Sequence, residues 1–276
     1  MWTRFHQPLP MGTPAVQTLT ILTVMPSPAL EIRGLCKTFG TFRAVDNIDL
    51  VVRPGTFHGI VGPNGAGKST TIGMAVGLVV PDAGEISILG IDAVHDRGAA
   101  RSLTGVLPDG LDLPERLTGA ELLRYSAGLR GLSRSAAAER VTELIQVLGI
   151  TKAAATPLAD CSTGNRKKVG LAQALLHAPR LLVLDEPFEA VDPVSAASIR
   201  RVLRRFVDGG GTCVLSTHSM MLVEQMCDEV TVIHQGRVVA AGPVAEVAGG
   251  VALEDRFVEL VGAEAGGADG LGWLVR

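Results

Sequence analysis

The chain is poor in aromatic side chains and lacks long hydrophobic runs. Phe, Trp and Tyr make up 4% of its 276 residues, so a folded core must consist mainly of Ala, Val and Leu. A membrane-spanning helix needs about 20 mostly apolar residues. The most apolar runs, Ile72–Val80, Leu181–Leu184 and Val230–Ile233, are all shorter. The sequence therefore predicts a globular chain without a membrane-spanning helix.

Cysteine is also scarce, and its positions follow no metal-site or redox pattern. The four residues are Cys36, Cys161, Cys213 and Cys227, and no two of them have Cys-x-x-Cys spacing. No histidine lies at metal-ligand spacing from any of them. We therefore expect buried or half-buried free thiols in a reducing cytoplasm.

A surplus of basic charge is absent too. The chain has 25 Lys and Arg against 28 Asp and Glu, a formal net charge of −3 at pH 7. Broad nucleic-acid surfaces need a basic surplus, so we expect no nucleic-acid partner. The basic run Arg166–Lys168 and the arginines between Arg200 and Arg205 are interpreted as solvated helix faces.

Residues 29–262 are expected to form one folded α/β domain. Apolar strands are predicted over Thr56–Val61, Leu181–Leu184 and Thr212–Ser216, and a helical pattern follows each of them. This alternation favours a mostly parallel sheet covered by helices on both faces. From about residue 109 to 165 the pattern is helical, which we interpret as an inserted α-helical lobe.

The two ends of the chain have a different composition. Residues 1–28 contain Pro8, Pro10 and Pro14 and lack a small-residue cleavage site behind a continuous apolar core. They are therefore interpreted as a disordered leader instead of a signal peptide. Residues 263–276 are rich in Gly and Ala and are interpreted as a flexible tail.

Local signals predict where several elements begin and end. Thr118 and Glu121 have the spacing of a capping box, and Asp192 before Pro193 predicts a helix start. Further elements are expected as strands over Leu30–Ile32 and Ile48–Val52, a helix over Val169–Leu176, and a final hairpin of Val230–Ile233 with Arg237–Ala241.

The most specific local motif is the glycine-rich segment GPNGAGKS. It fits G-x-x-x-x-G-K-[ST] between a predicted strand and a predicted helix, which is the context of a phosphate loop. Its glycines let successive N–H groups turn toward phosphate oxygens, and the helix N-terminus adds positive charge. Lys68 would contact the β- and γ-phosphates, and the Ser69 hydroxyl would bind Mg²⁺. The expected phosphate-binding residues are Gly62, Pro63, Asn64, Gly65, Ala66, Gly67, Lys68, Ser69 and Thr70.

An acidic pair follows the apolar strand Leu181–Leu184. Asp185 would hold Mg²⁺ through water, and Glu186 would act as the general base for an attacking water. An acidic pair at a strand end is ordinary by itself. Combined with a phosphate loop, it predicts a centre for nucleotide hydrolysis, in which Lys68 and Glu186 are catalytic.

His218 ends the next predicted strand. Because ligands bind at the carboxyl ends of strands in such sheets, we expect His218 to contact the γ-phosphate and to be a third catalytic residue. The other histidines lack this setting and are interpreted as structural.

In this order, the motifs resemble the ATP-binding subunit of an ABC transporter, over roughly residues 30–242. The most specific segment begins at Ser162 and resembles the family signature, whose usual form is LSGGQ. Ser162 and Gly164 match that form, whereas Cys161, Thr163 and Asn165 depart from it. In this family the signature of one subunit closes the ATP site of the other. The resemblance therefore implies a head-to-tail dimer, with Ser162 and Gly164 binding the nucleotide of the partner.

The resemblance also implies a fold and a set of ligands. The implied fold is a P-loop NTPase (RecA-like) core with an N-terminal antiparallel β subdomain and an inserted helical lobe. Phe39 stands where an aromatic ring stacks on adenine. Asp109 stands where a glutamine usually links the nucleotide to the transmembrane subunit, and it would approach Mg²⁺ through water. The implied ligands are ATP and Mg²⁺.

The partner implied by the resemblance is a separately encoded transmembrane permease, with the ATPase subunits forming a homodimer or a heterodimer. The chain would then be cytoplasmic, held on the inner face of the cell membrane by the permease. The run DEPFEAVDP from Asp185 to Pro193 resembles prokaryotic export-type ATPases of the multidrug or ABC-2-like kind. Export is therefore the expected direction of transport.

Two other functions stay open at this point. One is a soluble ABC-type ATPase acting on ribosomes or DNA, although many of these carry two nucleotide modules or long coiled coils. The other is a different P-loop NTPase, such as a GTPase or a small-molecule kinase. The sequence lacks the Asn-Lys-x-Asp guanine motif, and the segment from Ser162 has no role in a kinase. A neighbouring gene for a multi-span membrane protein would favour the transporter.

Overall fold

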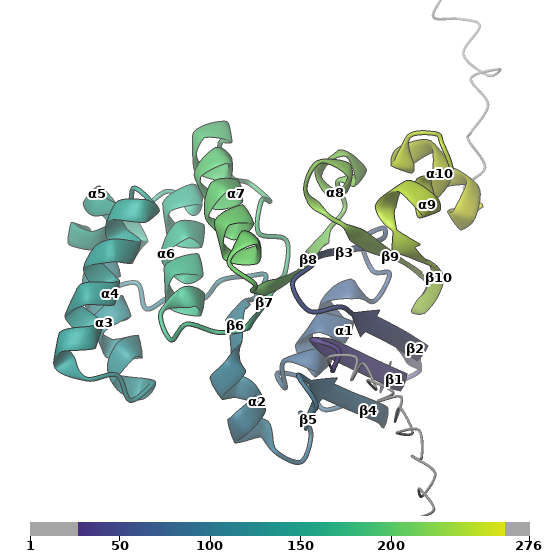
Figure 1. Cartoon of the computed structure of the whole chain (residues 1–276), viewed down its shortest axis with the longest axis horizontal. Coiled ribbons are helices and arrows are strands. Elements are labelled where there is room, and N and C mark those ends of the chain that lie inside the picture. The colour runs from purple at the N-terminus through teal and green to yellow at the C-terminus, as the bar shows by residue number, and fades with distance from the viewer. Residues whose placement is uncertain (1–26, 263–276) are drawn as a thin grey trace, which may run out of the picture.

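A computed structural model describes residues 27–262 of the chain. Most of the expected leader and the whole expected tail, residues 263–276, lie outside the described residues. The described part combines helices with two β-sheets (Figure 1). The helices between residues 119 and 155 lie at one end of the molecule, and the N-terminal strands lie at the other.

The larger sheet is mostly parallel, as the sequence predicts. Its spatial order is β10-β9-β3-β8-β7-β6, and only the pairing of β10 with β9 is antiparallel. The bounds are β3 Phe57–Val61, β6 Thr104–Leu107, β7 Leu181–Leu184, β8 Thr212–Thr217, β9 Glu229–His234 and β10 Arg237–Pro243. The final hairpin predicted from the sequence is therefore confirmed as β9 and β10.

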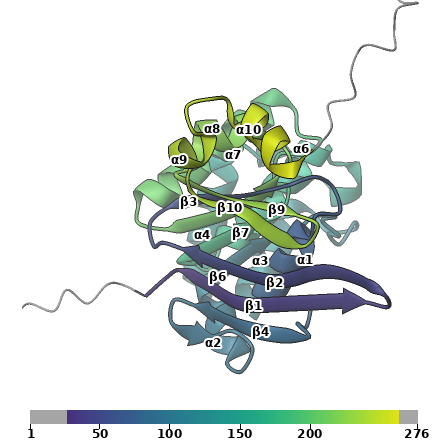
Figure 2. The ribbon, with the colours of Figure 1, turned by 90° about the vertical axis from the view of Figure 1, so that its right-hand side faces the viewer.

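The smaller sheet is antiparallel and confirms the expected N-terminal β arrangement. Its order is β2-β1-β4-β5 (Figure 2), with β1 Leu30–Phe39, β2 Phe42–Val52, β4 Ala83–Ile88 and β5 Ile91–Asp92. Both N-terminal strands are longer than the sequence pattern indicates. The pairing of β1 with β2 shifts register between Ile32 and Leu35 and again before Lys37. These irregularities interrupt the period-two alternation from which a strand is recognised.

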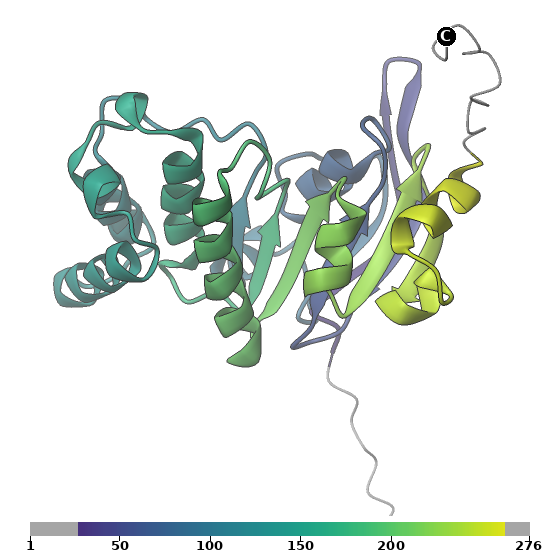
Figure 3. The same ribbon diagram turned by 90° about the horizontal axis from the view of Figure 1, so that it is seen from above.

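Helices cover the larger sheet. Figure 3 shows α6, α7 and α8 side by side along one of its faces. No helix within residues 27–262 is long and apolar enough to cross a membrane. The helices are α1 Lys68–Ala75, α2 Arg97–Leu103, α3 Gly119–Leu129, α4 Arg134–Val147, α5 Thr151–Ala155, α6 Thr163–Leu175, α7 Pro193–Asp208, α8 Met220–Met226, α9 Val244–Ala248 and α10 Leu253–Val261, with a 3-10 turn at Leu158–Asp160.

Side-chain caps fix the starts of six of these helices, α2, α3, α4, α6, α7 and α8. The capping box of Thr118 and Glu121 is present at α3, and Asp192 caps α7 with Pro193 in its first turn. The helix predicted over Val169–Leu176 begins earlier, at Thr163. The reason is that the Ser162 side chain caps it by accepting a hydrogen bond from the Asn165 N–H at 3.4 Å.

The core consists of two apolar clusters on opposite faces of the larger sheet. Along β7, Leu182 and Leu184 point into the cluster under the helices α3 to α8. Leu181 and Val183 point into the other cluster, which also contains Ile72 of α1 and the inner side chains of the smaller sheet. α1 is therefore packed between the two sheets. This helix follows the phosphate loop, so the loop is anchored to both sheets.

The topology brings four strand ends to one edge of the larger sheet. β3, β8, β7 and β6 are consecutive neighbours and run parallel. The phosphate loop follows β3, His218 follows β8, Asp185 follows β7, and Asp109 lies just beyond β6. The predicted site residues of these segments therefore lie along the carboxyl edge of the sheet, where ligands bind in open α/β sheets.

Gly105 of β6 provides a test of how closely α6 packs against the larger sheet. A Cβ atom at Gly105 would lie 2.2 Å from the Ala174 carbonyl oxygen and 2.7 Å from Leu182 Cδ2. Gly105→Ala must push α6 away from the sheet, and we expect it to lower the free energy of unfolding by about 2–3 kcal/mol. Urea unfolding followed by circular dichroism measures the change.

Gly98→Ala in α2 is the matched control for Gly105→Ala. A Cβ atom there has only the Asp96 Oδ1 atom within contact range, at 4.0 Å. Alanine also favours the helix over glycine by up to about 1 kcal/mol. We expect this variant to be unchanged or more stable. Equal unfolding midpoints for both variants would contradict the close approach of β6 and α6.

Candidate functional site

Most of the predicted site residues surround one open pocket of about 420 Å³ at the carboxyl edge of the larger sheet. Gly62, Pro63, Asp185, Ser162 and Gly164 are the predicted residues that do not line it. The lining residues are Phe39, Phe42, Ala44, Asn64, Gly65, Ala66, Gly67, Lys68, Ser69, Thr70, Asp109, Glu186, Glu189 and His218.

The phosphate loop requires glycine at two positions for a steric reason. A Cβ atom at Gly62 would lie 2.1 Å from the Ile233 carbonyl oxygen of β9. Gly67 has a φ of 105°, and a Cβ atom there would lie 2.5 Å from the Ala44 carbonyl oxygen. The loop is therefore held between β9 and β2, in a backbone conformation that side chains would obstruct.

Lys68 is the buried positive charge of the pocket. Its Nζ donates hydrogen bonds to the carbonyl oxygens of Gly62 at 2.8 Å and Pro63 at 3.2 Å. The Oε1 atom of Glu186 lies 3.9 Å from it. A buried ammonium needs such partners because it has lost its water. The loop thus holds a positive charge within reach of the carboxylate that follows β7.

A serine that the sequence did not single out joins the two acidic residues. The Ser216 hydroxyl donates a hydrogen bond to Asp185 Oδ1 and accepts one from the Glu186 N–H at 2.9 Å. Ser216 precedes His218 by two residues in the buried strand β8. The only signal for Ser216 in the sequence is a polar side chain near the end of an apolar strand. That signal does not identify its partners, because Asp185 and Glu186 follow a different strand, β7.

His218 and Glu186 are in direct contact. The Nδ1 atom of His218 lies 3.2 Å from Glu186 Oε1, and the imidazole is 56% exposed whereas Glu186 is buried. The β7–β8 pairing places the two residues together, in agreement with the expected meeting of neighbouring strand ends. Asp109, beyond β6, is exposed and also lines the pocket.

Two exposed phenylalanines stand at the tip of the β1–β2 hairpin, which projects from the molecule in Figure 3. Phe39 is 50% exposed and Phe42 is 61% exposed, and both line the pocket. Lys37 lies over the Phe39 ring, with its Nζ 5.5 Å from the ring centre, and forms an ion pair with Asp82 at 2.8 Å. The sequence pointed to Phe39 but missed Phe42, although two Phe residues around one turn are unusual in a chain with few aromatics.

Ser162 and Gly164 lie apart from the pocket. Ser162 caps α6, and a Cβ atom at Gly164 would lie 2.9 Å from both Asp192 Oδ2 and Ser195 Oγ. Hydrogen bonds from Ser195 hold the pKa of Asp192 below its ordinary value, so this carboxylate is ionised at neutral pH. The start of α6 is therefore packed against the start of α7, and neither residue reaches the phosphate loop of its own chain.

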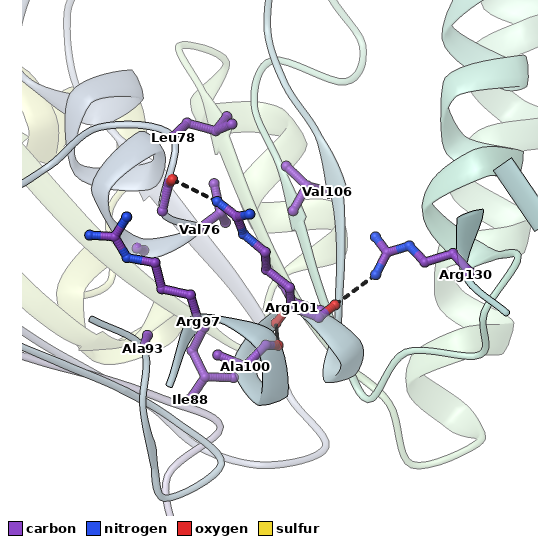
Figure 4. A pocket seen from close by; sticks show the side chains of 12 residues that line it. Val76, Leu78, Ile88, Ala93, Arg97, Ala100, Arg101, Val106 and Arg130 are labelled. Atoms are coloured by element: carbon purple, nitrogen blue, oxygen red, sulfur yellow. Dashed lines mark hydrogen bonds between the residues drawn. The ribbon is translucent and has the colours of Figure 1, made fainter. Parts of the chain in front are cut away.

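A second pocket of about 250 Å³ contains none of the predicted site residues. Figure 4 shows Arg97 and Arg101 of α2 and Arg130, which follows α3, around apolar side chains such as Leu78 and Val106. Arg101 donates to the Gly77 carbonyl oxygen at 3.1 Å, and Arg130 to that of Arg101 at 2.8 Å. No carboxylate is among the residues that line this pocket, so it is positively charged.

The oxygen atoms near the phosphate loop fit a magnesium ion. Across residues 27–262, no three His, Cys, Asp or Glu side chains are grouped as a metal site. Mg²⁺ is usually held by only one or two carboxylates together with substrate phosphates. Asp185 offers one carboxylate, and no hydrogen bond from the described residues engages its Oδ2 atom. The Ser69 hydroxyl lines the pocket. Both are hard oxygen ligands of the kind that Mg²⁺ prefers.

Comparison with known proteins finds extensive similarity. The family model described as ABC transporter matches residues 45–189, a range that includes the phosphate loop and the acidic pair. The daunorubicin/doxorubicin resistance ATP-binding protein DrrA of Streptomyces peucetius is 38% identical over 226 residues, which cover 82% of this chain and 68% of that protein. The Nod factor export ATP-binding protein I of Cupriavidus metallidurans is 36% identical over 213 residues, covering 77% and 70%. A solved ATP-binding subunit of an ABC transporter has a TM-score of 0.78 and 31% identity, covering 84% of this chain and 99% of that chain.

Phe42 gives a prediction for nucleotide binding. If both hairpin rings contact the base, Phe42→Ala should weaken ATP binding by about two- to tenfold, the effect of losing one aromatic contact. Binding of inorganic tripolyphosphate, which has no base, should not change. Isothermal titration calorimetry measures both affinities.

Val51→Ala is the matched control, because Val51 is an exposed apolar residue of the same strand that does not line the pocket. We expect its ATP and tripolyphosphate affinities to equal those of the unmodified chain. Equal weakening of both ligands by Phe42→Ala would mean that the hairpin ring supports the phosphate loop instead of the base.

Proposed function

This chain belongs to the ABC transporter family, and we propose that it binds and hydrolyses ATP to drive a separate transmembrane permease in export. The arrangement at the carboxyl edge of the larger sheet carries this proposal. The phosphate loop, Glu186 and His218 come from three parallel strands and meet in one pocket. The export direction is supported by relatives that are named for drug resistance and for Nod factor export.

The phosphate loop would hold the triphosphate. Residues Asn64 to Ser69 line the pocket at the start of α1, where the helix dipole favours negative charge and loop N–H groups would bind phosphate oxygens. The Lys68 ammonium would exchange its bonds to loop carbonyl oxygens for bonds to the β- and γ-phosphates. Phe39, together with Phe42, would stack on the adenine at the far end of the pocket.

The residues at the strand ends would carry out hydrolysis. Glu186 would accept the proton of the attacking water, because its carboxylate is anchored near Lys68 and borders the pocket. His218 would hold that carboxylate in place and reach the γ-phosphate. Ser69 and Asp185 would hold Mg²⁺, with Asp109 joined to it through water, and the ion supplies positive charge to the transferred phosphate.

A second subunit would complete the site. Ser162 and Gly164 do not line the pocket of their own chain, yet they match the family signature. In a head-to-tail dimer they would meet the γ-phosphate held by the partner. The dimer would contain two copies of this chain or one copy with a related ATPase. No nucleic-acid partner is proposed.

The pocket of three arginines would contact the permease from the cytoplasmic side. Arg97, Arg101 and Arg130 carry no ion pair within residues 27–262. Leu78 beside them is 65% exposed. Charge complementarity therefore favours an acidic segment with apolar side chains. Since Asp109 lies beyond β6, and Val106 of that strand lines the arginine pocket, the permease contact and the nucleotide site share one strand.

Glu186→Gln tests the hydrolytic step and the dimer together. Because an amide cannot accept the proton of water, turnover should fall by about 10²- to 10⁴-fold while ATP binding is retained. With saturating Mg-ATP this variant should run as a dimer in size-exclusion chromatography with light scattering. Glu143→Gln, in the exposed surface of α4, is the control and should keep full turnover. Unchanged turnover in Glu186→Gln would remove Glu186 from the role, and a strictly monomeric species would contradict the dimer.

Arg97→Glu tests the permease contact. Arg97 is exposed, and the structure gives its side chain one hydrogen bond, to the Val94 carbonyl oxygen. The change should therefore spare the fold and the basal ATPase rate. It should lower the rate stimulated by the reconstituted partner permease at least fivefold, measured in proteoliposomes. Arg124→Glu, an exposed arginine of α3 outside the pocket, should leave the stimulation intact. Equal stimulation of both variants would exclude the arginine pocket as the contact.

A further inference from the structure

We infer that Lys167, in the first turns of α6, is a positioning residue that fixes the general base Glu186. This inference rests on the proposed function, because it assigns Lys167 a role only if Glu186 acts in hydrolysis. The observation is a hydrogen bond from the Lys167 ammonium to the main-chain carbonyl oxygen of Glu186. It joins the segment that begins at Ser162 to the strand end that carries the base.

The environment of Lys167 is unusual for a lysine. The residue is only 7% exposed, so the solvated helix face expected for Arg166–Lys168 is wrong for this lysine. No carboxylate within residues 27–262 lies at ion-pair distance from its Nζ atom, and its one side-chain hydrogen bond there is the bond to Glu186. Removing a charged amine from water without an ion-pair partner opposes folding. The burial of Lys167 therefore indicates a specific role in the site and not a contribution to the stability of the fold.

The backbone of Glu186 explains what that task is. Glu186 has a φ of +45°, in the left-handed region that residues other than glycine rarely adopt. Such strained conformations persist only when the surroundings hold them, and they gather at functional sites. Glu186 is held at three points: its N–H by Ser216, its carbonyl oxygen by Lys167, and its carboxylate by His218. The Glu186 carbonyl oxygen also accepts a longer hydrogen bond from the Glu189 N–H, at 3.3 Å.

These three contacts act on different atoms of one residue. Ser216 and Lys167 fix the two ends of the Glu186 residue, so the side chain leaves the main chain in one direction. Its carboxylate is thereby directed to the pocket, 3.9 Å from Lys68. Without Lys167, only the longer Glu189 N–H contact holds this carbonyl oxygen, so the strained φ can relax toward an ordinary value and turn the carboxylate away from the site of the attacking water. Nucleotide binding, which depends on the phosphate loop, is not affected by this rotation.

Lys167→Met is the test, because methionine keeps the unbranched apolar stem of lysine, one atom shorter, but has no donor. Turnover and KM for Mg-ATP are measured on the purified full chain, with nucleotide affinity from a fluorescent ATP analogue and unfolding temperature in parallel. We expect kcat to fall about ten- to a hundredfold, the effect of losing a charged hydrogen bond. KM and nucleotide affinity should stay within twofold. Lys167→Gln, which keeps a neutral donor, should restore part of kcat and also serves if the methionine variant folds poorly.

Lys168→Met is the matched control. Lys168 is the next residue of the same helix and is equally buried at 7% exposure, but its side chain makes no hydrogen bond to Glu186. Its kcat should stay within twofold of the unmodified chain. An equal loss of kcat in both methionine variants would overturn the inference in favour of general packing of α6.

The double variant, Lys167→Met with Glu186→Gln, distinguishes a failure of the inference about Lys167 from a failure of the proposed function. If Lys167 acts through Glu186, Lys167→Met should lower turnover no further once Glu186 is replaced. If Glu186→Gln alone keeps full turnover, the proposed role of Glu186 fails. If Glu186→Gln abolishes turnover while Lys167→Met keeps it, the proposed function stands and the inference about Lys167 is wrong.

Discussion

The parallel pairing of β3, β8, β7 and β6 is the constraint on which the rest of the site depends. Each strand contributes one chemical group just beyond its carboxyl end. The register of the strand pairing determines where that group lies relative to the groups of the neighbouring strands. Side chains alternate between the two faces of a strand, so a slip of one residue in β7 would exchange Leu182 and Leu181 between the two apolar clusters. The buried faces therefore fix the register. The position of Asp185 beside Ser216 is a consequence of apolar packing further down the same strands.

The charged groups at this edge serve function more than stability. Lys68, Asp185 and Glu186 are all buried, and their partners are few hydrogen bonds and one long ion pair. Burying charges usually costs more free energy than a single pair returns. The two apolar clusters must supply the difference. This also explains why Glu186 can be kept in a left-handed conformation, which the surroundings impose on it.

Much of the fold and the site could be predicted from the sequence, because their signals are local. The phosphate loop, the capping box at Thr118 and the cap at Asp192 each lie within a few residues of chain. Ser216, Lys167 and Phe42 could not be assigned in the same way, since their partners are separated in sequence and meet only through strand pairing, helix packing or a hairpin. The roles of Ser162 and Gly164 stay predictions, because the surface that would test them belongs to a second subunit.

The turn between β9 and β10 affects the order in which parts of the protein can fold during synthesis. Its Gly236 donates to the Ala66 carbonyl oxygen at 2.9 Å and accepts from the Asp46 N–H at 2.8 Å. The Ile233 carbonyl oxygen lies so close to Gly62 that it leaves no room for a side chain there. The phosphate loop is therefore clamped by residues that a ribosome adds long after the loop itself has emerged. A nascent chain that ends before β9 carries the whole nucleotide motif, yet its loop lacks the support that gives it shape. The final shape of the nucleotide-binding loop thus depends on the C-terminal hairpin, the last part of the sheet to be synthesised.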